Sequence, residues 1–280
     1  MLFSHKSIGA ICVFLSATLF AWAGVLIKFN SWSSMTINGT RCFFAFMMIA
    51  GYMKVKGHKF IFNRAVLGCG MANFLMGLLF VYANKMTTAA NAIVLQFTMP
   101  LFIILLLWIF WKEKPHRAEL IACAASFVGI ICFFFDRLSF TGMMGNVLAI
   151  LSGLFYAVVF LTKKVPGADF ESATLVSFLI SFVLALPSIL QEVPTAPDPG
   201  RNLLDVMALG LIQQGISYIL LNIGLNRISS FSASLLSMWE PILNPLLVAV
   251  IFGEVMGPMA LIGSVIVLGS AIFYNLRAAS

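Results

Sequence analysis

Long apolar segments follow one another through almost the whole chain, and each has the length that crosses a lipid bilayer. A membrane-spanning helix needs about 20 apolar residues at a rise of about 1.5 Å each. Hydrophobic residues make up 61% of the chain and charged residues 10%, whereas soluble globular proteins are about half apolar and about a quarter charged. Ten segments qualify, at residues 8–28, 33–53, 65–84, 88–111, 118–135, 143–162, 171–191, 203–224, 230–252 and 257–276. The sequence therefore predicts an all-α polytopic membrane protein with ten transmembrane helices.

The basic residues are distributed unequally between the two sides of these spans. Of the 17 Lys and Arg residues, twelve fall on the side of the N-terminus and four on the opposite side, while Arg41 lies within the second span. Cytoplasmic loops carry an excess of Lys and Arg in membrane proteins. We therefore expect both termini to be cytoplasmic. The net charge of +7 then reflects these loops, and no nucleic-acid binding is expected.

One pattern occurs twice, at a separation of 141 residues. Pro100 is followed by Glu113 and Pro241 by Glu254, and each pair lies in a long apolar segment. Proline removes a backbone donor and clashes with the preceding turn, so both helices should be kinked. We predict that Pro100 and Pro241 act as kinks or gating pivots.

The repeat divides the chain into two halves, residues 1–137 and 138–280, with five predicted spans each. An odd number of spans makes the second half insert upside down relative to the first. The sequence therefore predicts two inverted five-helix repeats, and in transporters of this kind the substrate site lies at the interface between the repeats.

The sequence resembles the EamA-type members of the drug/metabolite transporter superfamily over essentially its whole length. The motifs that carry the resemblance are Phe20-Ala21-Trp22, Thr87-Thr88-Ala89-Ala90-Asn91-Ala92 and Trp239-Glu240-Pro241. The sequence departs from the family at Trp111-Lys112-Glu113, where Leu-Gly-Glu is more usual. The resemblance implies two EamA repeats and a carrier in the bacterial inner membrane. Such carriers move small metabolites, often outward, through a central cavity.

Glu240 is the strongest candidate for a functional side chain. A charged, unpaired group in the middle of an apolar span costs several kcal/mol, so Glu240 should face a polar cavity, pair with a cation or be protonated. Its counterpart in the first repeat is Met99, so the acid is not a symmetric structural feature. Ser237 and Asn244 share its helix face. Glu240 is expected to carry a proton or to balance a cationic substrate; the alternative is a structural acid beside the proline.

Other polar side chains lie in spans that the repeat relates to one another. Gln214 and Tyr218 share one face of the eighth span, and Asn73 occupies the position in the third span that corresponds to Gln214. We expect these groups to meet across the axis that relates the halves. They would contact substrate, or alternatively join helices by hydrogen bonds, as amides do in membranes.

Aromatic side chains complete the predicted site. Trp22, Tyr156 and Trp239 lie deep in their spans, and an aromatic wall beside an acid suits an organic cation through cation–π attraction. The full set of predicted substrate-binding or coupling residues is Glu240, Trp239, Gln214, Tyr218, Asn73, Trp22, Gln96, Tyr156, Ser237 and Asn244.

The predicted function is secondary transport of small organic metabolites by alternating access, with or without proton coupling. Amino acids, amines and similar amphipathic or cationic compounds are the expected substrates, and export the expected direction. An uncoupled facilitator or exchanger, or a membrane protein with a structural or signalling role, is the alternative. The spans contain no catalytic Asp pair, zinc motif or Ser/His pair, so no enzyme activity, cofactor or metal is expected. The expected partners are substrate, lipid and, if coupled, protons, and the chain is expected to be a monomer or weak homodimer.

Overall fold

The computed structural model describes residues 5–87, 89–135, 142–195, 197–252 and 258–279, and the described residues form helices without a β-strand. The helices of the N-terminal half are α1 (His5–Ala21), α2 (Ala23–Phe29), α3 (Ser34–Lys56), α4 (Arg64–Met86), α5 (Ala89–Gln96), α6 (Met99–Trp111) and α7 (Arg117–Phe134). Those of the C-terminal half are α8 (Met143–Leu161), the 3-10 turn η2 (Thr162–Lys164), α9 (Phe170–Glu192), α10 (Pro199–Met207), the π-helix η3 (Ala208–Ile216), α11 (Ser217–Leu225), α12 (Ser230–Ser237), α13 (Glu240–Phe252) and α14 (Pro258–Ala279). Glu254, which the sequence pairs with Glu113, lies outside the described residues.

Eight helical segments of the described chain are long and apolar enough to cross a membrane. The two predicted spans that are not among the eight are α3 and the segment that the structure divides into α12 and α13. α3 has the length of a span, but Asn38 and Arg41 lower its hydropathy. The described residues are therefore helical, with eight segments that have the length and hydropathy of membrane spans, and the count of ten stays a prediction.

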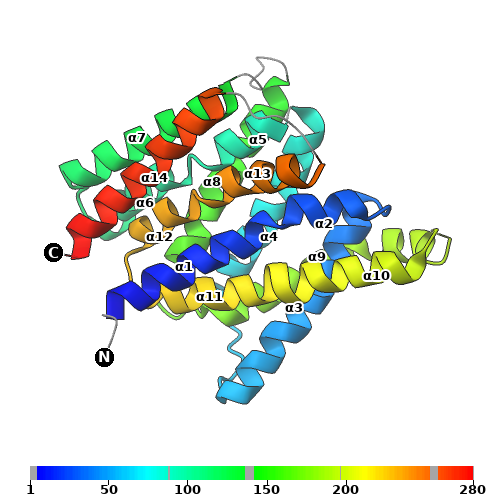
Figure 1. Ribbon diagram of the computed structural model, residues 1–280. Coiled ribbons are helices and arrows are strands. Elements are labelled where there is room, and N and C mark those ends of the chain that lie inside the picture. Colours follow the sequence, from blue (N-terminus) through cyan, green and yellow to red (C-terminus); the bar gives the residue numbers. More distant parts are fainter. Residues whose placement is uncertain (1–4, 88, 136–141, 196, 253–257, 280) are drawn as a thin grey trace.

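The helices pack side by side as one bundle, and Figure 1 shows the start of α1 and the end of α14 at the same end of it. The main contacts between helices join the two halves of the chain. α3 packs on α9, α7 on α14, and α4 on both α8 and α9. α1 packs on α11, α12 and α13, α3 also contacts η3, and α5 and α6 lie against α8. The two halves therefore form one packed unit.

Two helices are interrupted at positions that the sequence repeat relates. α5 gives way to α6 across residues 97–98, and α12 gives way to α13 across residues 238–239. At each break a backbone amide donates to the carbonyl three residues back instead of four. Pro100 and Pro241 follow directly in the first turn of the next helix. A proline costs no intrahelical hydrogen bond there, because the amides of the first turn have no partner within the helix. The breaks bring Trp239 and Glu240 to the start of a new helix.

Candidate functional site

Glu240 is the first residue of α13, immediately after the break in the ninth predicted span. Its side chain is half-buried, and within the described part of the chain its carboxylate has no hydrogen-bond or ion-pair partner. It lies close enough to the phenol groups of Tyr156 on α8 and Tyr218 on α11 to interact with them electrostatically. Glu240 and the two tyrosines therefore converge from three helices on one region of the bundle.

Tyr218 is 6% exposed and joins α11 to α4. Its hydroxyl donates a hydrogen bond to Asn73 Oδ1 at 2.9 Å. The ring makes edge contacts with Phe20 and Phe178, with centroid distances of 5.5 Å and 5.2 Å. The structure thus brings together the polar groups of the third and eighth predicted spans, with Tyr218 as the partner of Asn73.

Gln214 lies in the π-helix η3 beside α3, where its Nε2 is 3.8 Å from Cys42 Sγ. Three polar oxygens of this region are buried and have no hydrogen-bond partner among the described residues, and they are Gln213 Oε1, Gln214 Oε1 and Ser217 Oγ. A buried acceptor left unpaired costs about 1–3 kcal/mol. These oxygens are therefore the most available hydrogen-bonding groups of the site.

The π-helix itself was not predicted from the sequence. Single π-helical turns occur frequently at functional sites, because the extra residue changes the direction of the side chains that follow. One signal in the sequence is Gly210, where a Cβ atom would lie 2.6 Å from the carbonyl oxygen of Arg41 on α3. The close approach of η3 and α3 therefore depends on glycine. It brings Gln214 next to Cys42.

Tyr156 is 8% exposed and lies among aromatic rings. It makes edge contacts with Phe97, which is in the break between α5 and α6, and with Phe160, with centroid distances of 6.2 Å and 5.2 Å. The two interrupted helices therefore contribute neighbours to one site: Phe97 beside Tyr156 from the first break, and Glu240 from the second.

The two predicted tryptophans have different surroundings. Trp239 stacks on Phe14 at a centroid distance of 5.5 Å, and its Nε1 donates to Thr18 Oγ1 on α1 at 3.1 Å. Trp22, between α1 and α2, is 40% exposed. Trp239 thus anchors the break of the ninth predicted span to α1, whereas Trp22 lies at the surface of the bundle.

Gln96 is the last residue of α5 and takes part in a hydrogen-bonded connection between helices. Its Nε2 donates to Ser152 Oγ on α8 at 2.8 Å, and Ser152 Oγ donates to the carbonyl oxygen of Met76 on α4 at 2.7 Å. The contacts of Gln96 are those of an interhelical amide.

Of the remaining predicted residues, Ser237 is buried and Asn244 half-buried.

Arg41 is the second charged residue near Tyr218. Its Nε and Nη2 donate to Asn38 Oδ1 one turn earlier in α3, at 3.2 Å and 2.8 Å. This intrahelical partner accounts for part of the hydrogen bonding of Arg41. Its proximity to Tyr218 places it at the border of the site.

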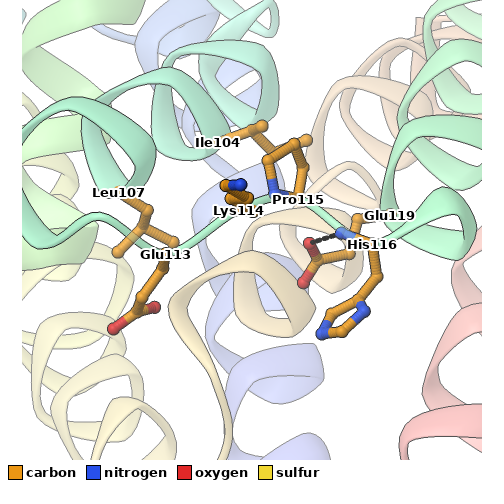
Figure 2. Close-up of a pocket in the computed structure, with 7 residues that line it drawn as sticks. All are labelled: Ile104, Leu107, Glu113, Lys114, Pro115, His116 and Glu119. Atoms are coloured by element: carbon orange, nitrogen blue, oxygen red, sulfur yellow. Dashed lines mark hydrogen bonds between the residues drawn. The ribbon is translucent and has the colours of Figure 1, made fainter.

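A separate pocket of about 330 Å³ lies at the connection between α6 and α7 (Figure 2). It is lined by Ile104, Leu107, Glu113, Lys114, Pro115, His116 and Glu119. The backbone amide of His116 donates to the Glu119 carboxylate at 3.0 Å, and the ion pair of Glu113 with Lys164 lies nearby. None of the ten predicted contact residues lines this pocket, so it is distinct from the site around Glu240.

Comparison with protein families decides the class of this protein. The model of the EamA-like transporter family matches residues 7–135 and again residues 143–276. The chain belongs to this family. The predicted resemblance to EamA-type transporters is thereby confirmed, and the protein is a multi-pass membrane protein of a transporter family.

Relatives of the chain are named as transporters. An uncharacterized transporter of Archaeoglobus fulgidus is 23% identical over 269 residues, which are 94% of this chain and 95% of the relative. The uncharacterized transporter YdfC of Bacillus subtilis is 24% identical, over 78% of this chain and 71% of the relative. Mouse solute carrier family 35 member G1 is 28% identical over 44% of this chain and 35% of the relative.

A solved crystal structure has the same fold as this family member. It superimposes with a TM-score of 0.83 and covers 98% of this chain and 99% of the other, with 18% sequence identity. At that identity the similarity establishes the fold alone.

Proposed function

We propose that this protein is a secondary carrier that moves small organic metabolites by alternating access, through ten spans arranged as two inverted five-helix repeats. The observation that carries the proposal is Glu240, a half-buried carboxylate that has no partner among the described residues and lies within electrostatic range of the phenol groups of Tyr156 and Tyr218. In an apolar span, such a group is expected to face a water-filled cavity or a ligand.

The contacts between helices support the inverted repeat. A five-helix repeat makes α1–α2 correspond to α8, α3 to α9, α4 to α10–α11 with η3, α5–α6 to α12–α13, and α7 to α14. The contact of α4 with α8 then corresponds to that of α11 with α1, and the contact of α4 with α9 to that of η3 with α3. The packing of α5 and α6 on α8 corresponds to that of α12 and α13 on α1, while the pairs α3–α9 and α7–α14 map onto themselves. This is the pattern that a twofold pseudo-symmetry axis between the halves produces.

The chemistry of the site favours a substrate with a positive charge and an apolar body. Glu240 supplies a negative charge, and the rings of Tyr156, Tyr218 and their phenylalanine neighbours supply π-faces that attract cations. The unpaired oxygens of Gln214 and Ser217 are acceptors, which suit an ammonium donor. We therefore propose amines, amino acids or similar cationic or zwitterionic compounds as substrates, with export as the direction.

The paired helix breaks give this carrier a means of opening. A broken helix has fewer backbone hydrogen bonds to lose when its two parts change their angle. The breaks before Pro100 and Pro241 lie beside Tyr156 and Glu240, so a change of angle at either break would move the site's own residues. Alternate movement of the two breaks would open the site to one side and then to the other.

The proposal also covers the orientation of the chain in the membrane and the coupling of transport to protons. The excess of Lys and Arg on one side of the predicted spans supports cytoplasmic termini and insertion in a bacterial inner membrane. Glu240 would bind a proton in a coupled cycle, or remain a counter-charge in an uncoupled one. We expect a monomer or weak homodimer to be the working unit.

Transport by the purified protein in proteoliposomes tests this function. The panel contains a labelled organic amine, a zwitterionic amino acid and an organic anion, each offered with and without an imposed pH gradient. We expect saturable uptake of the amine or the amino acid, and little uptake of the anion. If a pH gradient drives uptake, transport is coupled to protons. If uptake is the same with and without the gradient, the protein is a facilitator or exchanger.

Two matched variants separate the site from the fold. Glu240→Gln keeps the size of the side chain and should remove most of the saturable uptake. Glu113→Gln alters a carboxylate with 50% side-chain exposure at the end of the α6 segment and should leave uptake unchanged. If no compound of the panel crosses the membrane through the protein, the carrier function is wrong. Normal uptake by Glu240→Gln would leave the carrier but refute the site.

A further inference from the structure

A second cluster of ligand-forming side chains, which does not include Glu240, lies where α3 ends and α9 begins. The imidazole of His58, in the loop between α3 and α4, faces Asp169 with 3.0 Å between His58 Nε2 and Asp169 Oδ1. The Glu171 carboxylate, in the first turn of α9, completes the cluster, and one ligand atom from each of the three residues lies within 4.8 Å of the others. His58 is more than 110 positions from Asp169 and Glu171 in the sequence, which is why no motif indicated the cluster.

Backbone contacts hold the three side chains in place. α3 ends at Gly57 in the left-handed conformation, and the next amide, that of His58, donates to the Met53 carbonyl at 2.9 Å. The loop is also attached to the first turn of α9, because the Ile61 amide donates to Ser172 Oγ at 3.1 Å. The cluster is thus organised without any ion.

The Asp169 carboxylate uses both of its oxygens within the protein, whereas the Glu171 carboxylate uses one and leaves the other unpaired. Asp169 caps α9, since its Oδ2 accepts from the Ser172 amide at 2.8 Å, while Oδ1 points to His58. Glu171 accepts a hydrogen bond from Asn222 through Oε1. Glu171 Oε2 has no partner in the described structure, although the residue is only 8% exposed.

No cationic side chain neutralises Glu171 directly within the described chain. Arg227 and Glu171 both lie in electrostatic range of Tyr52, but the Arg227 guanidinium donates from Nη1 to the Ile223 carbonyl, four residues earlier, at 2.8 Å. A buried carboxylate oxygen with neither a hydrogen bond nor a counter-charge is costly, and a bound cation would satisfy it.

We propose that His58, Asp169 and Glu171 form a binding site for a divalent transition-metal ion of the Zn²⁺ type. One imidazole nitrogen and two carboxylate oxygens are ligands that Zn²⁺ accepts, with bonds of about 2.0–2.2 Å that place neighbouring donor atoms about 3.0–3.5 Å apart. The distance between His58 Nε2 and Asp169 Oδ1 is already 3.0 Å. Magnesium takes oxygen ligands and retains its waters, so the imidazole selects against it.

The site would connect the two segments of the chain that the family model matches, residues 7–135 and 143–276. His58 belongs to the first match and Asp169 and Glu171 to the second. A bound ion would hold the loop between α3 and α4 against the start of α9, where α3 and α9 already pack. It would therefore raise the resistance of the whole protein to unfolding, whatever substrate the protein carries.

Calorimetric titration of the purified protein with Zn²⁺ tests the site directly, using protein prepared without a polyhistidine tag and first treated with chelator. The full chain should bind one Zn²⁺ ion, and Mg²⁺ at the same concentration should not displace it. His58→Ala and Glu171→Gln should each weaken binding at least about tenfold, because even an outer-sphere partner of a metal is typically worth that factor. His5→Ala, which removes an exposed histidine outside the cluster, is the matched control and should bind as the wild type does.

Thermal unfolding separates a lost ligand from a damaged fold. Without metal, His58→Ala should unfold at the wild-type temperature, because this side chain is 37% exposed. Added Zn²⁺ should raise the unfolding temperature of the wild type and of His5→Ala, but not of His58→Ala. No binding by the wild type, or equal binding by His58→Ala, would overturn the proposal and leave an ion pair between His58 and Asp169. Neither result depends on the transport function.

Discussion

Replacing Gly263 with alanine should weaken the contact of α7 with α14. A Cβ atom at Gly263 would lie 2.4 Å from the Gly129 carbonyl oxygen and 2.4 Å from the Phe133 amide nitrogen. Both are backbone atoms, so no side chain can rotate away and the two helices have to separate by roughly 1 Å. Overpacking of this kind costs up to about 3 kcal/mol, and alanine regains about 1 kcal/mol over glycine in a helix.

The net loss for Gly263→Ala is therefore about 2 kcal/mol. Since 1 kcal/mol corresponds to about 2–4 °C in proteins of 150–250 residues, the unfolding temperature in detergent should fall by roughly 4–8 °C. Gly269→Ala is the matched control in the same helix, because a Cβ atom there meets no atom within 4 Å. It should leave the temperature unchanged or raise it. Equal behaviour of the two variants would refute the close packing of α7 on α14.

Three further substitutions test individual contacts by the same thermal measurement. Tyr218→Phe removes the donor to Asn73 Oδ1 but keeps the ring, so we expect a loss of about 1–2 kcal/mol, and no loss would mean that this buried bond is absent. Gln96→Leu breaks the connection to Ser152 and should cost about 0.6–1.7 kcal/mol, the range for interhelical bonds in membranes, whereas a stabilised variant would contradict it. Glu113→Gln removes the ion pair with Lys164, and because both side chains are at least 35% exposed the loss should stay within about 1 kcal/mol; a larger loss would show that the pair is shielded from solvent.

Much of the fold could be predicted from the sequence, because a bilayer allows few solutions. Apolar length and the absence of any water to bind exposed backbone groups require helices, and all the regular structure of the described residues is helical. The proline repeat also located the two helix breaks, since Pro100 and Pro241 each follow one. The π-helix η3 could not be predicted, because its nine residues have the same apolar pattern as an ordinary helix.

The candidate site was predictable as a set of polar residues but not as a set of contacts. Asn73 was expected to meet the polar groups of the eighth span, Gln214 and Tyr218, and its hydrogen bond comes from Tyr218, one turn beyond the repeat-related Gln214. The repeat relates positions in the two halves, but it does not specify which side chain reaches Asn73. The cluster around His58 illustrates the same limit, because only packing of α9 against the end of α3 brings its residues together.

The central claim is that the region around Glu240 lies between the two halves and becomes accessible to water from each side of the membrane. Side-specific labelling with a membrane-impermeant thiol reagent tests this most directly, in a variant without the five native cysteines. A cysteine at Asn244, one turn from Glu240 on α13, should react from both sides, whereas a cysteine at Val265, which is 71% exposed on α14 and should face lipid, should react from neither. Labelling at Asn244 from one side only, or from neither side, would contradict alternating access at this site.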